Sequence, residues 1–356
     1  MQPPPVDPSA LALPAPAPQA RVLRFHFTGE AGEYFRIWIV NMLLTIVTLG
    51  IYSAWAKVRN KQYFYRHTFV DGTSFEYLAD PIRVLKGRLI VAGALALVVG
   101  SHYYSLLLYG ILVGASVLAT PWLVVKALSF NARNSAYRNV RFSFAGRAGE
   151  AFGLYLGLGF LHLLTCGLAY PYMQWRLTKF AATEHSFGDR RFYWVTEVGA
   201  YYMAYLIAFL SALPIYGLFF GLVISTSMSA SRGDRTAMFV AMPLAYLGML
   251  IPAAFLKARL ANSLYGGLRI GTDSLTSSQR GRDLCWIYFT NALAVGGTLG
   301  LLIPWAKVRL ARYRAGSVDL HVTGPIDAIA LSGQRDPAAI GDAASDLGDF
   351  DFDFSP

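Results

Sequence analysis

The polar side chains that could act together in this chain stand at matched positions inside apolar segments. Two asparagines each lie seven residues before the threonine of a Thr-Leu-Gly triplet. An unpaired amide is costly in an apolar medium, so these groups must face protein or water. Two interpretations stay open, a polar lining for a permeation path or hydrogen bonding between helices. The predicted polar site consists of Asn41, Thr48, Asn291 and Thr298.

Basic residues follow the same segments and offer a second kind of site. Lysine and arginine bind phosphate and carboxylate groups, so anionic lipid headgroups or an anionic solute are the candidate ligands. The alternative is that these side chains extend to the membrane interface and fix the orientation of the protein. The candidate residues are Lys57, Arg59, Arg176, Lys307 and Arg309.

Catalytic and metal-binding motifs are not present in the sequence. There is no His-Glu-x-x-His, no Gly-x-Ser-x-Gly and no P-loop, and the six histidines are scattered. The two cysteines, Cys166 and Cys285, are far apart in apolar segments and do not indicate a metal site or a disulfide framework. We therefore predict no enzyme, no cofactor, no metal and no nucleic-acid partner.

The elements that hold these residues are predicted from composition. Hydrophobic residues make up 55% of the chain, charged residues 15%, and mean hydropathy is +0.41. A soluble domain carries about a quarter charged residues. The apolar residues form runs of nearly the ~20 residues that cross a bilayer as a helix. These runs cover residues 89–99, 106–125, 200–225 and 238–256.

The sequence contains an internal repeat. Residues 24–33 return at residues 141–150 with seven of ten positions identical, and residues 55–59 return unchanged at residues 305–309. The repeat predicts one membrane domain, residues 21–325, with copies at about 21–137, 138–265 and, in part, 266–325. Each copy carries a helix that is interrupted at the glycine of its Thr-x-Gly triplet. These predicted breaks are Gly50, Gly167 and Gly300.

Short strands are predicted beside the helices from period-two alternation, around residues 24–28, 74–78, 191–195 and 318–322. The predicted fold class is an all-α polytopic membrane protein with short cytoplasmic β-strands. Residues 1–20 are Pro- and Ala-rich, residues 326–356 are acidic, and both are predicted to be disordered tails.

Charge distribution suggests the topology. If the three motif segments dip into the membrane and return, all of the 31 Lys and Arg residues except Arg232 and Arg235 fall on one side. Basic residues accumulate on the cytoplasmic side, so we expect four full spans plus three broken or re-entrant helices, with both termini cytoplasmic. Seven spans are the alternative.

The residues around these motifs resemble a known family. Phe25-x-Phe27-x-Gly29 and the segment 41–56 look like the signature of YjgN-like proteins, and the similarity covers about residues 20–325. The resemblance implies a multi-pass bacterial inner-membrane protein and brings no activity with it. From the residues we expect transport or permeation of a small solute or lipid. The alternative is a non-catalytic scaffold or lipid-organising protein with a cytoplasmic docking face. The partners expected are membrane lipids with anionic headgroups, and a homo-oligomer is left open.

Overall fold

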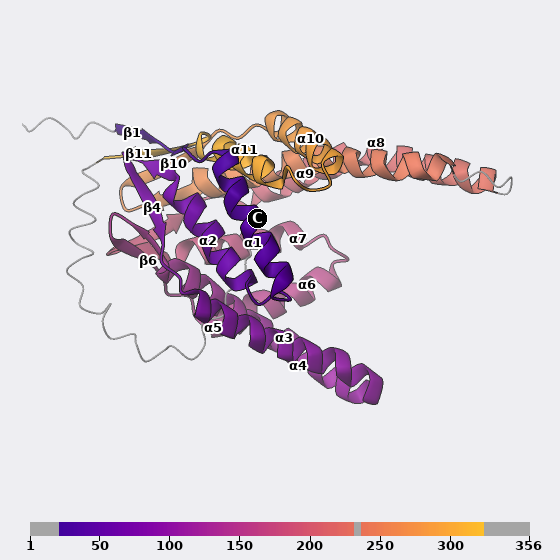
Figure 1. Ribbon diagram of the computed structural model, residues 1–356, viewed down its shortest axis with the longest axis horizontal. Coiled ribbons are helices and arrows are strands. Elements are labelled where there is room, and N and C mark those ends of the chain that lie inside the picture. Colours follow the sequence, from indigo (N-terminus) through magenta and orange to yellow (C-terminus); the bar gives the residue numbers. More distant parts are fainter. Residues whose placement is uncertain (1–20, 231–235, 324–356) are drawn as a thin grey trace, which may run out of the picture.

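The computed structural model describes residues 21–230 and 236–323, with side chains described outside residues 226–247. The chain forms two parts, a group of strands at one end and a set of helices that extends away from it (Figure 1). The predicted tails, 1–20 and 326–356, lie outside the described residues, as do Arg232 and Arg235.

All described strands belong to one antiparallel sheet, in the order β1-β11-β10-β9-β8-β7-β6-β5-β4-β3-β2. The first and last strands of this order are consecutive in the chain and only Phe25 separates them, so the sheet closes on itself as a nearly complete barrel. The N–H of Phe25 donates to the carbonyl oxygen of Val318 across the closure, at 3.2 Å. The strands are β1 (Arg21–Arg24), β2 (His26–Phe27), β3 (Thr68–Val70), β4 (Thr73–Tyr77), β5 (Ser135–Tyr137), β6 (Val140–Phe144), β7 (His185–Phe187), β8 (Arg190–Trp194), β9 (Leu268–Ile270), β10 (Asp273–Ser277) and β11 (Val318–Val322).

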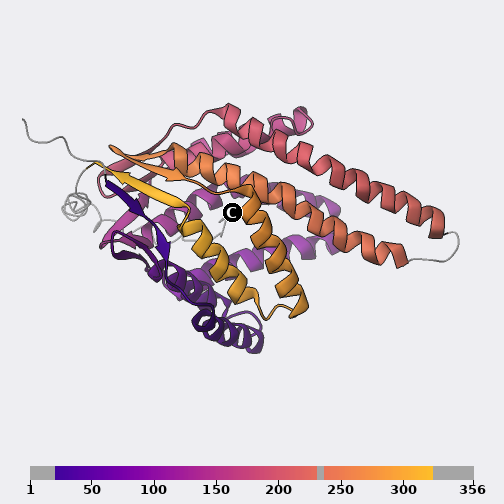
Figure 2. The same cartoon turned by 90° about the horizontal axis from the view of Figure 1, so that it is seen from above.

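The connections between neighbouring strands alternate between the two rims of the barrel, because consecutive strands pair in antiparallel fashion. One rim carries the two-residue turns, of which Asp71-Gly72 has both residues at positive φ, as a tight hairpin needs. The other rim carries five helical hairpins within the described chain (Figure 2). Their helices are α1 (Ala31–Val47) and α2 (Ser53–Arg66); α3 (Pro81–Tyr104) and α4 (Leu106–Arg133); α5 (Ala148–Phe152), η2 (Gly153–Gly157), α6 (Leu158–Leu164) and α7 (Tyr170–Thr183); α8 (Val198–Ala230) and α9 (Thr236–Gly267); α10 (Gly281–Gly297) and α11 (Ile303–Ala315).

The helical hairpins follow one another around the barrel. Contacts join α2 to α3, α4 to α5, α7 to α8, α9 to α10 and, closing the circle, α11 to α1. At this closure the Nη2 of Arg312 donates to the carbonyl oxygen of Gly29 at 2.9 Å. The first and last helical hairpins of the chain are therefore direct neighbours.

The three short hairpins share one turn conformation. The hydroxyl of Thr48 donates to the carbonyl of Leu44 at 2.8 Å and accepts from the N–H of Tyr52 at 2.9 Å. Leu49 has φ 51° and Gly50 φ 93°, a left-handed exit from the helix that favours glycine. The corresponding angles are 49° and 94° at Cys166 and Gly167, and 50° and 93° at Leu299 and Gly300.

The barrel interior is a packed apolar core. Val70, Tyr137, Val140, Phe187 and Val322 are all buried and form one cluster. The hydroxyl of Tyr137 donates to the carbonyl oxygen of Val70 at 2.9 Å, so its polar end is satisfied. Side chains thus fill the space that the strands enclose.

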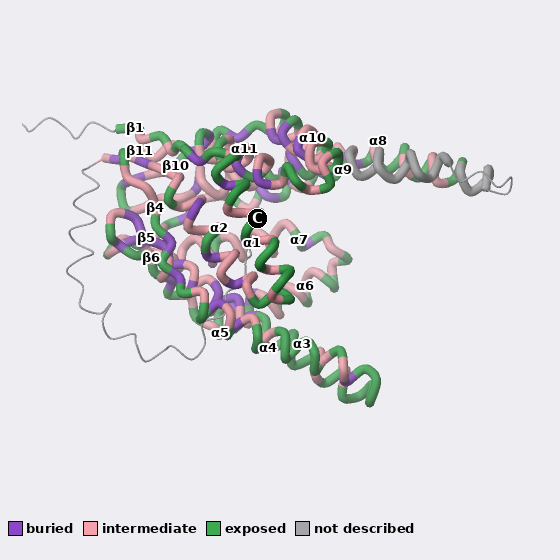
Figure 3. The backbone as a smooth tube through the Cα atoms, in the orientation of Figure 1, coloured by how far each residue is buried: buried purple, intermediate pink, exposed green. Residues whose placement is uncertain are grey.

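Two parts of the predicted fold class are wrong. The chain is not all-α, because its short strands form a nearly closed eleven-stranded sheet. Four full spans are also wrong for the described residues, where two helices, α4 and the part of α8 at Val198–Ser225, are long and apolar enough to cross a bilayer. Both expose most of their apolar residues (Figure 3).

The alternative of seven spans is wrong as well. Each motif segment is a hairpin whose two ends pair in the sheet, as β2 pairs with β3 around α1 and α2. At 1.5 Å per residue, α1 is about 26 Å long, short of the ~30 Å of a bilayer core. The chain therefore reverses direction within each of these segments.

Candidate functional site

The central pocket lies where the barrel meets the helices and has a volume of about 660 Å³. Each helical hairpin, or a strand at its base, contributes to its wall. The lining residues are Phe25, Phe64, Tyr65, Thr68, Phe75, Asn131, Ala132, Ser135, Phe142, His185, Tyr265, Leu275, Ala311, Arg314, Ala315 and Val318.

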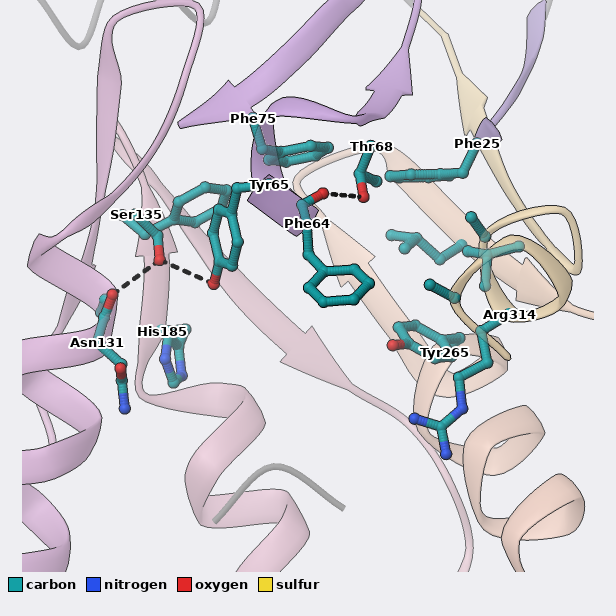
Figure 4. Close-up of a pocket in the computed structure, with 16 residues that line it drawn as sticks. Phe25, Phe64, Tyr65, Thr68, Phe75, Asn131, Ser135, His185, Tyr265 and Arg314 are labelled. Carbon is teal, nitrogen blue, oxygen red and sulfur yellow. Dashed lines mark hydrogen bonds between the residues drawn. The ribbon is translucent and has the colours of Figure 1, made fainter. Parts of the chain in front are cut away.

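The two ends of the pocket differ in chemistry. Phe25 and Phe75 lie on the barrel side, with stacked rings whose centroids are 6.1 Å apart. Asn131, His185 and Arg314 lie on the helix side (Figure 4). No Asp or Glu is among the described residues that line the pocket. The pocket thus has an apolar, aromatic floor and a polar mouth that includes one guanidinium.

Hydrogen bonds fix the polar wall on the side of α4. The Oδ1 of Asn131 accepts from Nζ of Lys61 at 2.9 Å, which joins α2 to α4. The Oγ of Ser135 lies 2.8 Å from the carbonyl oxygen of Asn131 and 3.2 Å from the hydroxyl of Tyr65. Lys61 adds a second positive charge close to the mouth.

The setting of His185 favours the neutral form of its ring. Burial lowers the pKa of its ring below the ordinary value, and the ring nitrogen Nδ1 is hydrogen-bonded to the carbonyl oxygen of Ala181. The ring also packs edge-on against Phe144, with centroids 4.9 Å apart. Arg314 is therefore the permanently charged residue among the described residues that line the pocket, and Lys61 bonds to the lining residue Asn131.

The residues of the predicted polar site do not converge. Thr48 and Thr298 each cap the turn of their own hairpin. The Nδ2 of Asn41 donates to Oδ1 of Asn60 at 3.3 Å. Asn291 accepts from Arg309 at 3.2 Å. None of the four predicted residues is among those that line the central pocket.

The other predicted residues lie along the short hairpins. Gly50, Gly167 and Gly300 lie in the turns at the hairpin tips. The five basic residues lie on the second helices of the short hairpins, and the partners of Arg59 and Arg309 lie in the same hairpin as each arginine. Arg59 donates to the hydroxyl of Tyr52 at 3.0 Å, and Arg309 donates to Thr290 and lies over the ring of Trp305. The basic residues are Lys57 and Arg59 on α2, Arg176 on α7, and Lys307 and Arg309 on α11.

Sequence reasoning missed the central pocket because its wall takes one to three residues from each of many separate elements. A signal was present in the Phe that recurs at the middle of five-residue strands, as in Phe75 of β4 and Phe142 of β6. Those residues alternate with outward-facing ones, so they point into the barrel.

The fold is a nearly closed antiparallel barrel that carries helical hairpins, and two of the described helices are long and apolar enough to cross a bilayer. The chain belongs to the family described as bacterial protein of unknown function (DUF898), whose model matches residues 22–347. The YjgN-like resemblance and the membrane class are thereby confirmed.

Curated relatives carry the name inner membrane protein YjgN. The relative from Salmonella typhimurium is 25% identical over 368 residues, which cover 87% of this chain and 91% of the relative. One from Escherichia coli O157:H7 is 35% identical over 121 residues, 34% of this chain and 30% of the relative. No solved structure matches the chain. These names support an inner-membrane location.

Proposed function

We propose that the protein binds an anionic single-chain amphiphile in the central pocket and passes it between the pocket and the bilayer. One observation carries the proposal: the pocket combines a floor of stacked phenylalanines with a mouth that holds Arg314. The volume of about 660 Å³ lies within the ~300–1,000 Å³ of small-molecule sites.

Each part of such a ligand has a matching surface. Burial of an acyl chain against the phenylalanines contributes about 0.8 kcal/mol per CH₂ group. A phosphate or carboxylate head pairs with Arg314 through charge-assisted hydrogen bonds. The packed barrel core closes the far side of the pocket, so the ligand enters and leaves on the helix side.

The barrel lies on the cytoplasmic side in this proposal. The support is the abundance of basic residues on the strands and near the bases of the helices, since the cytoplasmic side of a membrane protein carries the excess of Lys and Arg. The shared turn of the three short hairpins supports an internal repeat, in which the central pocket forms where the copies meet.

Ligand binding tests the proposal. Native mass spectrometry would compare oleoyl lysophosphatidate with uncharged monoolein on purified full-length protein and three variants. Wild-type protein is expected to prefer lysophosphatidate. Arg314→Gln removes the charge and should weaken lysophosphatidate binding by about 10- to 100-fold, since a hydrogen bond to a charged group contributes ~1.5–3 kcal/mol. Monoolein binding should be unchanged.

Two further variants separate the pocket from the general surface. Ala311→Phe fills the pocket and should reduce binding of both amphiphiles. Arg191→Gln, a matched charge change at an exposed position on β8, should leave both unaffected. Equal binding by wild type and by all three variants would refute the proposal.

The alternative function, a non-catalytic membrane scaffold, is favoured by a different observation. Thr48, Thr298 and Asn291 are hydrogen-bonded within their own hairpins, as groups with a purely structural role would be. Under this alternative, neither amphiphile binds at the central pocket, and an immobilised full-length protein captures a partner through the outer face of the barrel.

A further inference from the structure

A second pocket lies on the outer side of the helices, between α8, α9 and the start of α10, and has a volume of about 850 Å³. Three arginines line it, Arg259 of α9, Arg280 directly before α10, and Arg282 in its first turn. No carboxylate is among the described lining residues. The nearest one in contact is that of Asp283, 3.7 Å from Nε of Arg282, so the group keeps a net positive charge.

The backbone that presents these arginines is held from both sides. Asn262 of α9 donates from Nδ2 to the carbonyl of Gln279 at 2.8 Å and accepts from its N–H at 2.9 Å. The N–H of Arg280 donates to the hydroxyl of Tyr313 at 2.8 Å. A Cβ at Gly281 would lie 2.5 Å from the ring of Phe255, so α10 packs closely on α9 here. The site is therefore rigid before any ligand binds.

Two further features favour an anion in this pocket. Helix α10 begins without a side-chain cap, so its first N–H groups and the positive end of its dipole are available. The side chain of Gln279 lines the pocket, is only 6% exposed, and has no hydrogen-bond partner within the described chain. A phosphate oxygen in the pocket would accept a hydrogen bond from its amide.

The apolar side of the same pocket indicates the source of the phosphate. Met203 of α8 and Phe255 of α9 line it beside the arginines. From Met203, exposed apolar residues continue along one face of α8 at Leu206, Leu210 and Leu213. This stretch of α8 is long and apolar enough to cross a bilayer, so the arginines lie beside one end of a membrane helix.

From these contacts we infer that the outer pocket binds the phosphate of an anionic phospholipid, with one acyl chain lying along α8. Arg280, Arg282 and the N-terminus of α10 hold the phosphate, Arg259 closes the site from α9, and Gln279 donates from below. The site is separate from the central pocket and does not depend on the function proposed there.

Lipid retention tests the site. Purified protein would be incubated with phosphatidylglycerol, with phosphatidylcholine, or with glycerol 3-phosphate, and analysed by native mass spectrometry. Wild-type protein is expected to retain phosphatidylglycerol over phosphatidylcholine. Arg280→Gln and Arg282→Gln should each weaken retention of phosphatidylglycerol about fivefold, as expected for the loss of one basic contact at an anionic surface. Arg141→Gln, the same change at an exposed position on β6, should not affect it.

Gln279→Leu provides a test that does not change charge. It should weaken retention of phosphatidylglycerol while the thermal midpoint in detergent stays the same, because the amide makes no hydrogen bond within the described chain that the change would remove. A purely structural glutamine would give a lower midpoint with unchanged retention, and that result would overturn the inference. Equal retention across all variants would overturn it too. If glycerol 3-phosphate bound as tightly as phosphatidylglycerol, the site would be one for free phosphate esters, and the proposal of a phospholipid ligand would be refuted.

Discussion

Asn41 and Asn291 occupy the same place in two of the short hairpins, yet the same substitution should affect them differently. Asn41 is 3% exposed, makes one hydrogen bond at 3.3 Å, and its Oδ1 is buried without a partner. Asn291 donates to the carbonyl of Ala306 at 3.3 Å and accepts from Nη1 of Arg309 at 3.2 Å. We compare Asn41→Leu with Asn291→Leu.

The expected magnitudes follow from these partners. A neutral hydrogen bond contributes ~0.5–1.5 kcal/mol, and a buried unsatisfied polar atom costs ~1–3 kcal/mol. Asn41→Leu loses the stabilising hydrogen bond and also removes the destabilising unsatisfied oxygen. The free energy of unfolding of this variant should therefore stay within about 1 kcal/mol of wild type or rise. Asn291→Leu removes an acceptor from a guanidinium and should lower that free energy by about 1.5–3 kcal/mol.

The two asparagines differ in their partners because the equivalent arginines, Arg59 and Arg309, bond to different groups. Arg309 reaches Thr290 and Asn291, whereas Arg59, in the same place in the first hairpin, donates to the hydroxyl of Tyr52. The first hairpin has Val40 in the place of Thr290, and the last hairpin has Leu302 in the place of Tyr52. Neither side chain can form a hydrogen bond.

Unfolding of full-length protein in mixed micelles, with rising mole fraction of sodium dodecyl sulfate, measures both variants under one condition. Leu158→Asn examines the third equivalent position, where leucine is native. It should destabilise the protein, because Leu158 packs against an apolar cluster that includes Phe144 and Ala151, and an amide is costly to bury there. A loss at Asn41→Leu equal to that at Asn291→Leu would refute the reasoning from hydrogen-bond partners.

The remaining predictions concern the turns, the barrel and the orientation. Thr48→Val removes a hydroxyl that makes two hydrogen bonds, one to Leu44, and should lower the free energy of unfolding in micelles by about 1–3 kcal/mol. Because burial lowers the pKa of His185, the folded state binds fewer protons than the unfolded state below pH 6.5, so stability falls as pH drops from there; His185→Phe should remove this component of a pH titration of stability. Leu23→Asp places a charge against the barrel core and should abolish hydrogen-exchange protection in β1 and β11 while α4 stays protected. Arg141→Cys, in a background without the native cysteines, should react with an impermeant thiol reagent from the cytoplasmic side alone, and labelling from the periplasm would contradict the proposed orientation.

Local sequence was informative about the elements and uninformative about how they assemble. Alternation around residues 74–78 and 318–322 predicted strands, and strands lie there as β4 and β11. The partner strands β3, β5, β7 and β9 have three residues each, too few for a period-two pattern to be visible. The barrel exists because strands between helices pair around a ring, and no single segment encodes that pairing.

The candidate sites were hard to predict for the same reason. The Thr-x-Gly repeat drew attention to Thr48 and Asn41, whose hydrogen bonds lie within one hairpin. The central pocket depends on contacts such as that between Lys61 and Asn131, which are 70 residues apart in the chain. Spacing in the sequence reports neighbours along a helix, whereas a pocket at the centre of a ring is made of residues with no regular spacing.

The closure of the barrel has a consequence for biosynthesis. Residue 21 pairs with residue 322, so β1 leaves the ribosome before every other described strand and its partner β11 after all of them. Until β11 is made, β1 has an open edge that can pair with another chain, and β10 has one as well. A chain that stops before β11 cannot close the ring, so its open strand edge distinguishes it from a chain that contains β11. The open edge also exposes the truncated chain to aggregation and to proteases.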